Sequence, residues 1–135
     1  YYLYVVFEQI YNFRFFYYNL TDVLQRYPSI NRRFSRLMDL KVATALTILK
    51  ELVDNEAITA TNQDCVLLSE QAALTLTYCL NYQQLRGVEE DPALLFHGCV
   101  FSVTHIVAPY LAEQYRDVFE EVKVSLDLAR RTDFA

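Results

Sequence analysis

The sequence predicts an all-α fold, a helical bundle of about six helices that forms one domain over residues 1–135. Only 2 Gly and 3 Pro occur in 135 residues, so the chain has few positions for sharp turns, as long helices with short connections require. Its apolar residues recur at three- and four-residue steps, which is the period of an amphipathic helix. With 53% hydrophobic residues, including 11 Tyr and 9 Phe, the chain can fill a sizeable core.

The first helix is expected over residues 1–18. Its polar residues share one side of the helical wheel and apolar residues occupy most of the rest, so this helix should be buried on most sides. The apolar pattern is already established at Tyr1 without a preceding cap, and we therefore expect the natural protein to extend further towards its N-terminus. Asn19 offers an N-cap, with Asp22 in the first turn, for a short second helix that ends at Tyr27.

The third and fourth helices are expected on either side of a threonine-rich loop. Pro28 suits the first position of the third helix, which would reach Asn55 and span roughly 40 Å. Residues 57–63 form the loop, and the fourth helix covers residues 64–86. Gly87 is placed to end that helix in a left-handed conformation.

The clearest helix start in the chain is Asp91 followed by Pro92, an acidic N-cap before proline at the first helical position. The fifth helix should run from there to Pro109. After a bend at that proline, residues 112–131 form a final amphipathic helix.

The fifth helix could be mistaken for a membrane span, because 21 residues without a formal charge lie between Asp91 and Glu113. His97, Ser102 and His105 within the stretch, acids at both ends and the lack of a Lys or Arg bias argue against a span, so we expect no membrane partner. A helix apolar on nearly every side must then be covered by protein. Burial within one subunit is one possibility, and we favour the other, a second subunit.

Small residues recur along this helix and form a stripe that another helix could approach closely. We predict that this side of the helix is the interface of a homodimer. The predicted interface comprises Gly98, Phe101, Ser102, His105 and Pro109.

No spacing in the sequence matches a catalytic motif, a metal site or a phosphate-binding loop, so we expect neither an enzyme nor a bound metal or cofactor. His97 and His105 would lie about 80° apart around a helix and are poor co-ligands for one metal. The net charge of −5 excludes a generally basic surface, which argues against direct nucleic-acid binding. Cys65, Cys79 and Cys99 are odd in number, lack the paired spacing of zinc or redox sites and follow no signal peptide, so reduced cytoplasmic thiols are predicted.

The aromatic residues of the first helix indicate a pocket. Together with Tyr78 and Tyr82 they carry more phenolic hydroxyls than a dry core readily satisfies. Arg14 lies in the apolar sector, where an unpaired guanidinium is costly, so it needs an ion pair or carbonyl contacts between helices, which we favour, or an anionic ligand. We predict a small, largely apolar ligand that contacts Tyr11, Arg14, Phe15, Met38, Tyr78 and Tyr82.

The run YNFRFFYYNLTDVLQRYPSINRRF at residues 11–34 resembles the start of the regulatory domain in a subgroup of TetR-like (TetR/AcrR family) transcriptional regulators. LNYQQLRG at residues 80–87 and VAPYL at residues 107–111 resemble later segments of the same domain, so the resemblance covers nearly the whole chain. Two features depart from that pattern. Tyr27 stands where family members often have an acid before the proline, and the chain has no Trp.

The resemblance implies the C-terminal effector-binding and dimerisation domain of a cytoplasmic transcriptional regulator. The helices of residues 64–86 and 91–109 would pack as a four-helix bundle across the two-fold axis of a homodimer. A helix-turn-helix DNA-binding domain would precede Tyr1, and a bound effector would shift the spacing of the two DNA-binding heads. A purely structural helical dimer without a pocket is the first alternative, and a helical-bundle enzyme with a cofactor is the second.

Overall fold

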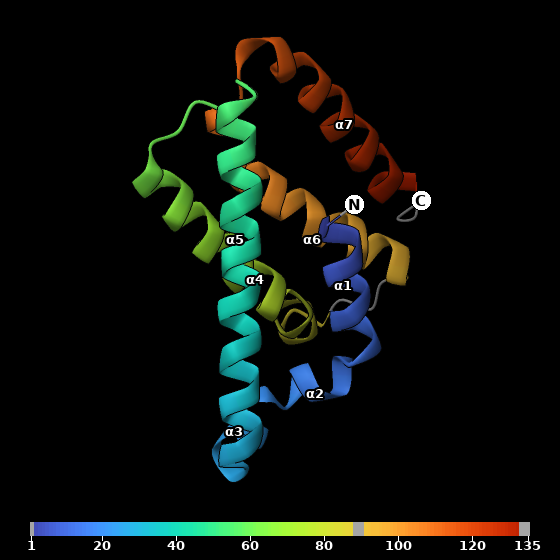
Figure 1. Ribbon diagram of the computed structural model, residues 1–135. Coiled ribbons are helices and arrows are strands. Elements are labelled where there is room, and N and C mark those ends of the chain that lie inside the picture. The colour runs from blue at the N-terminus through green and yellow to red at the C-terminus, as the bar shows by residue number, and fades with distance from the viewer. Residues whose placement is uncertain (1, 88–90, 133–135) are drawn as a thin grey trace.

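The computed structural model describes residues 2–87 and 91–132, and this part of the chain is all-α, as the sequence predicts. Tyr1, the expected start of the first helix, lies outside the described residues. Seven α-helices and one 3-10 helix follow one another along the described residues (Figure 1). They are α1 (Tyr2–Asn12), α2 (Arg14–Tyr18), α3 (Leu20–Arg26), α4 (Pro28–Asp54), α5 (Asn62–Leu85), α6 (Pro92–Val107), η1 (Ala108–Tyr110) and α7 (Glu113–Thr132).

The expected first helix is broken in two at Phe13, which corrects the prediction of one helix over residues 1–18. Phe13 has φ −105° and ψ 28°, outside the helical range, and the chain turns there. The break lets Tyr17 point into the core while Phe15 remains exposed. Asn19 is at the N-cap position of α3, as predicted, but its side chain does not cap the helix, because its amide instead donates a hydrogen bond to the carbonyl oxygen of Phe15 (2.8 Å).

Several predicted helix ends are confirmed. Pro28 is the first residue of α4, and Gly87 follows α5 with a φ of +66°. The Asp91 carboxylate accepts a hydrogen bond from the backbone N–H of Ala93 (2.8 Å), so it caps α6. Helix α5 begins two residues earlier than predicted, because Thr61 is the N-cap.

The start of α5 is a capping box. The Thr61 hydroxyl accepts a hydrogen bond from the backbone N–H of Asp64 (3.1 Å), and the Asp64 carboxylate accepts one from the backbone N–H of Thr61 (2.9 Å). Each side chain therefore satisfies a backbone donor that the first turn leaves without a helical partner.

We expect Thr61→Ala to lower the free energy of unfolding by about 1 kcal/mol, because it removes the oxygen that accepts from Asp64. Thr59→Ala is the matched control: Thr59 is also an exposed threonine, but only its backbone N–H bonds, to the carbonyl oxygen of Tyr110 (2.8 Å). Urea unfolding followed by circular dichroism measures both variants. Equal losses in the two would contradict a capping role for Thr61.

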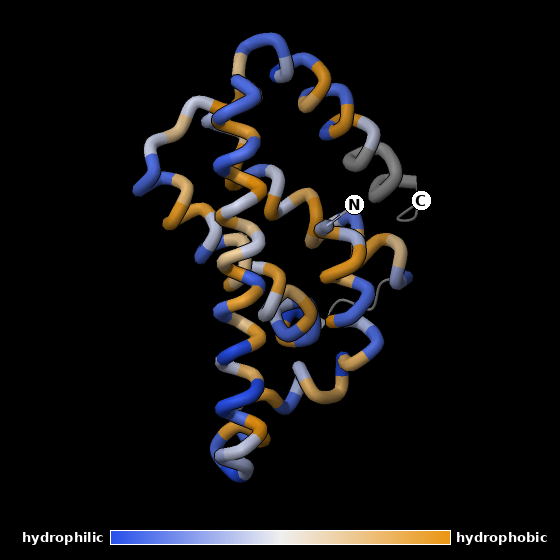
Figure 2. Tube along the Cα trace, in the orientation of Figure 1, coloured by the Kyte–Doolittle hydropathy of each residue, from blue (hydrophilic) through white to orange (hydrophobic). Residues whose placement is uncertain are grey.

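Helix α4 runs along the whole molecule, and α5 packs against it (Figure 1). Helix α5 also contacts α6, α2 and α1, so it lies at the centre of the bundle. Helix α7 leaves the end of η1 and extends away from α4, with polar and apolar sides that Figure 2 distinguishes. The loop before α5 is fixed against the chain after η1, because the backbone N–H of Ala112 donates to the carbonyl oxygen of Ala57 (2.9 Å).

Two clusters of buried side chains form the core. The first joins α1, α2, α5 and α6 and includes Phe7, Ile10 and Leu80. The second joins the C-terminal half of α4 to the start of α5 and to Ile58 in the loop between them.

A disulfide links Cys79 on α5 to Cys99 on α6, which corrects the prediction of three reduced thiols. The two cysteines are 20 residues apart in sequence, and the packing of α6 on α5 places their Cα atoms 6.1 Å apart. Cys65 is the free cysteine of the described residues and is buried. Sequence spacing alone could not show this pairing, because the packing of the two helices determines it.

The segment Pro92–Tyr110 is long and apolar enough, by length and composition alone, to cross a membrane, with a mean hydropathy of 1.4 over its most apolar window. Among the described residues it is the one segment that meets both conditions. One side of it packs inside the domain, where Cys99 and Val103 are buried. The opposite side, with Ser102 and His105, is exposed.

Candidate functional site

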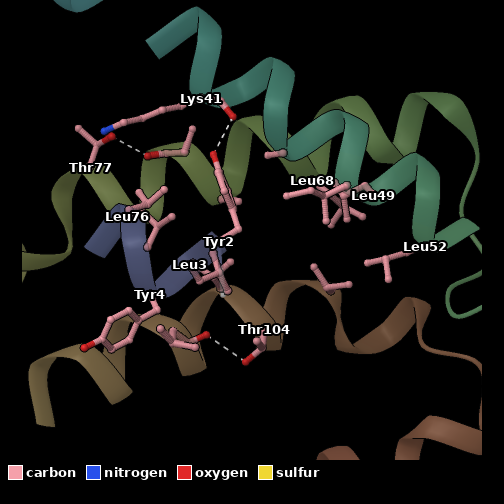
Figure 3. Close-up of a pocket in the computed structure, with 18 of the residues that line it drawn as sticks. Tyr2, Leu3, Tyr4, Lys41, Leu49, Leu52, Leu68, Leu76, Thr77 and Thr104 are labelled. Atoms are coloured by element: carbon pink, nitrogen blue, oxygen red, sulfur yellow. Dashed lines mark hydrogen bonds between the residues drawn. The ribbon is translucent and has the colours of Figure 1, made fainter. Parts of the chain in front are cut away.

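A cavity of about 450 Å³ lies between the two core clusters (Figure 3). Helices α1, α4, α5 and α6 form its walls, and Leu111 and Phe119 complete them. The volume is within the range of sites that hold small molecules. The lining residues are Tyr2, Leu3, Tyr4, Val6, Ile10, Lys41, Ala45, Ile48, Leu49, Leu52, Leu68, Ala72, Ala73, Leu76, Thr77, Phe96, Val100, Val103, Thr104, Val107, Leu111 and Phe119.

Helical periodicity explains why these side chains share one space. The lining residues of α4 lie at positions 41, 45, 48, 49 and 52, and those of α6 lie at positions 96, 100, 103, 104 and 107. Both sets follow three- and four-residue steps and so occupy one side of each helix. Each set covers eleven residue steps, which correspond to about 16 Å along a helix axis. Small side chains, Ala45 and Ala72 among them, leave room between the helices.

The cavity has a polar end at Lys41. The Lys41 ammonium donates a hydrogen bond to the Tyr17 hydroxyl (3.2 Å), and the Tyr2 hydroxyl donates one to the Lys41 carbonyl oxygen (3.1 Å). Thr77 lies at the same level, since its hydroxyl is 3.6 Å from the sulfur of Met38, one turn before Lys41. Figure 3 shows Lys41 and Thr77 at one end of the cavity and Leu49 and Leu52 towards the other.

Burial changes the acid–base properties of this polar end. Desolvation lowers the pKa of Lys41, because the charged ammonium is partly removed from water. The same effect raises the pKa of Tyr2 and of Tyr17, since it penalises the phenolate. Both phenols are therefore neutral hydroxyl groups at pH 7. Of the described residues that line the cavity, Lys41 is the one with a charged side chain.

The structure places the cavity away from the six residues that the sequence predicts as ligand contacts. None of them lines it. Tyr78 and Tyr82 are exposed on the side of α5 that faces away from the cavity. Met38 contacts Thr77, which lines the cavity, but does not line it itself. Tyr11, Arg14 and Phe15 form a separate group where α1 meets α2. The structure thus does not bring the six together around one space.

The partner of Arg14 is a carbonyl group, as the favoured interpretation of the sequence expects. Its guanidinium donates a hydrogen bond to the carbonyl oxygen of Tyr11 (3.2 Å). It also lies over two aromatic rings, 4.6 Å from the centroid of Tyr11 and 5.1 Å from that of Phe15. These contacts stabilise the charge at the break between α1 and α2.

The excess of phenolic hydroxyls in the sequence does not indicate where the cavity lies. The available signal lay in α4, where Lys41 falls on the same three- and four-residue steps as Ala45, Ile48 and Leu52. A charged side chain on the apolar side of a helix loses favourable hydration when that side is buried, as argued above for Arg14. Which helices face that side could not be found from the sequence.

The predicted interface residues of α6 lie on the side opposite the cavity. Ser102, His105 and Pro109 are exposed, Phe101 is half-buried, and Gly98 is buried. At 100° per residue, Ser102 projects about 160° away from Val100, which lines the cavity. This surface is therefore free for another subunit. A charge at Gly98 would also disturb packing within the domain, so Ser102 is the cleaner position to test.

Helix α5 carries a second exposed apolar surface, which we call the α5 seam. It consists of Leu67, Leu74, Tyr78, Tyr82 and Leu85, all exposed. These positions fall within about 80° of one another around the helix and lie away from the cavity-lining side. An exposed apolar row of this length is typical of a protein interface.

The structure shows no group of three or more His, Cys, Asp or Glu side chains that could hold a metal ion among residues 2–87 and 91–125, whose side chains are described. His97 and His105 are exposed. The His105 ring lies 5.7 Å from that of Phe101, and the His97 ring lies 5.4 Å from that of Phe96.

The described part of the chain is thus an all-α bundle with a cavity between its helices. The family model described as "TetR: Bacterial transcriptional repressor" matches residues 1–119. The chain therefore belongs to the TetR family, which is a family of transcription regulators and not of enzymes.

A solved structure has the same fold. It is a TetR-family transcriptional regulator from Marinobacter aquaeolei VT8, with a TM-score of 0.80 and 21% sequence identity. The match covers 93% of this chain and 60% of the Marinobacter chain, so the chain spans less than two thirds of that protein. No curated protein sequence matches this chain.

Proposed function

We propose that this domain senses a small, largely apolar molecule in the cavity between α1, α4, α5 and α6. The observation that carries the proposal is the cavity itself, about 450 Å³ in volume and lined mainly by aliphatic and aromatic side chains. Apolar walls with a few polar groups are typical of small-molecule sites. This cavity replaces the group around Tyr11 and Tyr78 as the proposed ligand site.

Helix α1 links the cavity to the proposed regulation. Tyr2, Leu3, Val6 and Ile10 of α1 line the cavity, so a ligand there would contact α1 directly. By the family resemblance, a helix-turn-helix DNA-binding domain would precede α1. A ligand that prefers one position of α1 would shift the spacing of two DNA-binding heads, and a coupling of about 1–3 kcal/mol would suffice for a switch.

We further propose that the domain acts as a homodimer in the cytoplasm, with α5 and α6 of each subunit in a four-helix bundle. The exposed side of α6 and the α5 seam support this assembly, because both lie opposite the cavity. Burial of these surfaces against a second copy removes apolar area from water, and a bilayer is not needed to cover them. In this proposal the domain contacts DNA only through the helix-turn-helix part.

A cavity-filling substitution tests the ligand site. We expect Ala45→Phe to abolish binding of apolar ligands, because its ring would occupy the space between α4 and α5. Ala43→Phe is the matched control, since Ala43 is exposed on the same helix and lines no part of the cavity.

The measurement is the melting temperature across a library of small apolar molecules. Ligands should stabilise the wild type and Ala43→Phe, by about 2.7 kcal/mol at a concentration of 100 Kd, and leave Ala45→Phe unchanged. A library in which no compound stabilises the wild type would favour a purely structural dimer. Equal stabilisation of Ala45→Phe would place the ligand elsewhere.

A further inference from the structure

The two ends of the cavity differ in chemistry. Near Lys41 the wall carries an ammonium group and two hydroxyl groups, those of Tyr2 and Thr77. Towards the other end it consists of Leu49, Leu52, Leu68 and Leu111, and Figure 3 shows the first three of these on the side away from Lys41. A ligand that satisfies both ends must itself be amphipathic.

Lys41 has unused capacity to bind a ligand. Its ammonium group has three N–H donors, and one of them bonds to the Tyr17 hydroxyl (3.2 Å). The ring of Tyr17 is 5.7 Å from the same nitrogen. Among residues 2–87 and 91–125, whose side chains the structure describes, no carboxylate lies within 4.0 Å of the Lys41 ammonium, and the one ion pair joins Arg26 to Asp22. None of the described residues that line the cavity has an acidic side chain either.

A half-buried cation beside an apolar wall is costly without an opposite charge. The other lysine of α4, Lys50, is exposed to water and lies outside the cavity wall. Lys41 thus differs from a surface lysine in both position and surroundings, and an anion in the cavity would supply the missing charge.

We propose that the ligand of this cavity is an aliphatic carboxylate, with its headgroup paired to Lys41 and its hydrocarbon tail against the leucines of the other end. This inference rests on the proposed function and names the chemical class of the effector. The lining residues of α4 cover about 16 Å, and an extended chain advances about 1.2 Å per bond, so a chain of roughly ten to twelve carbons fits that length.

The two hydroxyl groups at this end leave Lys41 as the donor for the headgroup. The Thr77 hydroxyl donates to the carbonyl oxygen of Ala73 (2.7 Å), and the Tyr2 hydroxyl donates to that of Lys41 (3.1 Å). Their protons are committed to the backbone, so the remaining lysine N–H groups are the donors that the carboxylate meets. A charge-assisted hydrogen bond of this kind is stronger than a neutral one, and a carboxylate gains more from it than an alcohol does.

The test compares decanoate with 1-decanol, which have the same tail and differ in headgroup charge. The Kd of each compound is measured on the purified protein by calorimetry or by displacement of a fluorescent probe. The wild type should bind decanoate at least about tenfold more tightly than 1-decanol. Lys41→Gln should remove this preference and leave the affinity for 1-decanol within about twofold, while Lys41→Arg should retain it.

Two variants serve as controls. Lys50→Gln removes a lysine from the same helix outside the cavity and should leave both affinities unchanged. Ala45→Phe should abolish binding of both probes. Unchanged 1-decanol binding by Lys41→Gln also shows that this variant retains the folded cavity.

The outcomes separate the two proposals. If the wild type binds both probes equally, or Lys41→Gln weakens both equally, the carboxylate proposal fails and the apolar ligand site stands. If decyltrimethylammonium binds more tightly than decanoate, the proposal that the headgroup of the ligand is negatively charged is wrong. If neither probe nor any apolar compound binds, or if Ala45→Phe binds decanoate normally, the cavity is not the ligand site and both proposals fail.

Discussion

Leu74→Glu is expected to convert the proposed homodimer to a monomer at micromolar concentration. Leu74 lies in the middle of the α5 seam, and a carboxylate there would be buried without a partner against the second subunit. We expect the dimer Kd to rise by at least about 100-fold, which corresponds to roughly 3 kcal/mol. Sedimentation velocity or light scattering over a dilution series measures this change.

Leu40→Glu is the matched control for Leu74→Glu. Leu40 on α4 is 63% exposed and Leu74 is 61% exposed, so both substitutions replace an accessible leucine with the same acid. Leu40 lies outside the α5 seam, and its variant should remain a dimer. Ser102→Glu should act like Leu74→Glu, because Ser102 is exposed on α6 opposite the cavity. The proposed interface would be refuted by dimeric Leu74→Glu and Ser102→Glu proteins with native helicity.

Reduction of the Cys79–Cys99 disulfide is expected to lower the free energy of unfolding by about 3 kcal/mol, because the bond closes a loop of about 20 residues in the unfolded chain. For a domain of this size the melting temperature should fall by roughly 10 °C. Cys99→Ala should cause a similar loss without reductant, and a reductant should then have no further effect. Calorimetry with and without dithiothreitol measures these differences.

Cys65→Ala separates the crosslink from the packing of a buried sulfur. Cys65 and Cys99 are 1% and 0% exposed, so both substitutions remove a fully buried side-chain atom. Cys65 is free, and its variant should keep the full response to dithiothreitol. A wild-type protein whose melting temperature does not respond to the reductant would contradict the crosslink.

Helix positions were the part of the fold that the sequence could predict well. The starts at Pro28 and Asp91 and the end at Gly87 depend on local backbone chemistry, namely proline geometry, side-chain capping and the left-handed conformation of glycine. The break at Phe13 was not predicted. The apolar pattern continues through it, and the break is useful only because Tyr17 packs against helices distant in sequence.

The sequence predicted that the domain has a pocket, but it did not predict which residues line it. An excess of aromatic residues indicated a pocket, and a cavity is present, yet Tyr78 and Tyr82 lie outside it. An exposed tyrosine and a cavity-lining tyrosine have the same local pattern on an apolar helix. Which of them faces the cavity depends on how α5 is rotated against α4 and α6.

The sequence by itself determined the class of fold, most helix ends and the kinship with TetR-like regulators, because these depend on local periodicity, capping and characteristic short runs. The tertiary structure alone decided that Lys41 lies at one end of an apolar cavity and that Cys79 meets Cys99. The physical reason is that burial and pairing depend on the relative rotation of packed helices, which many side chains determine together.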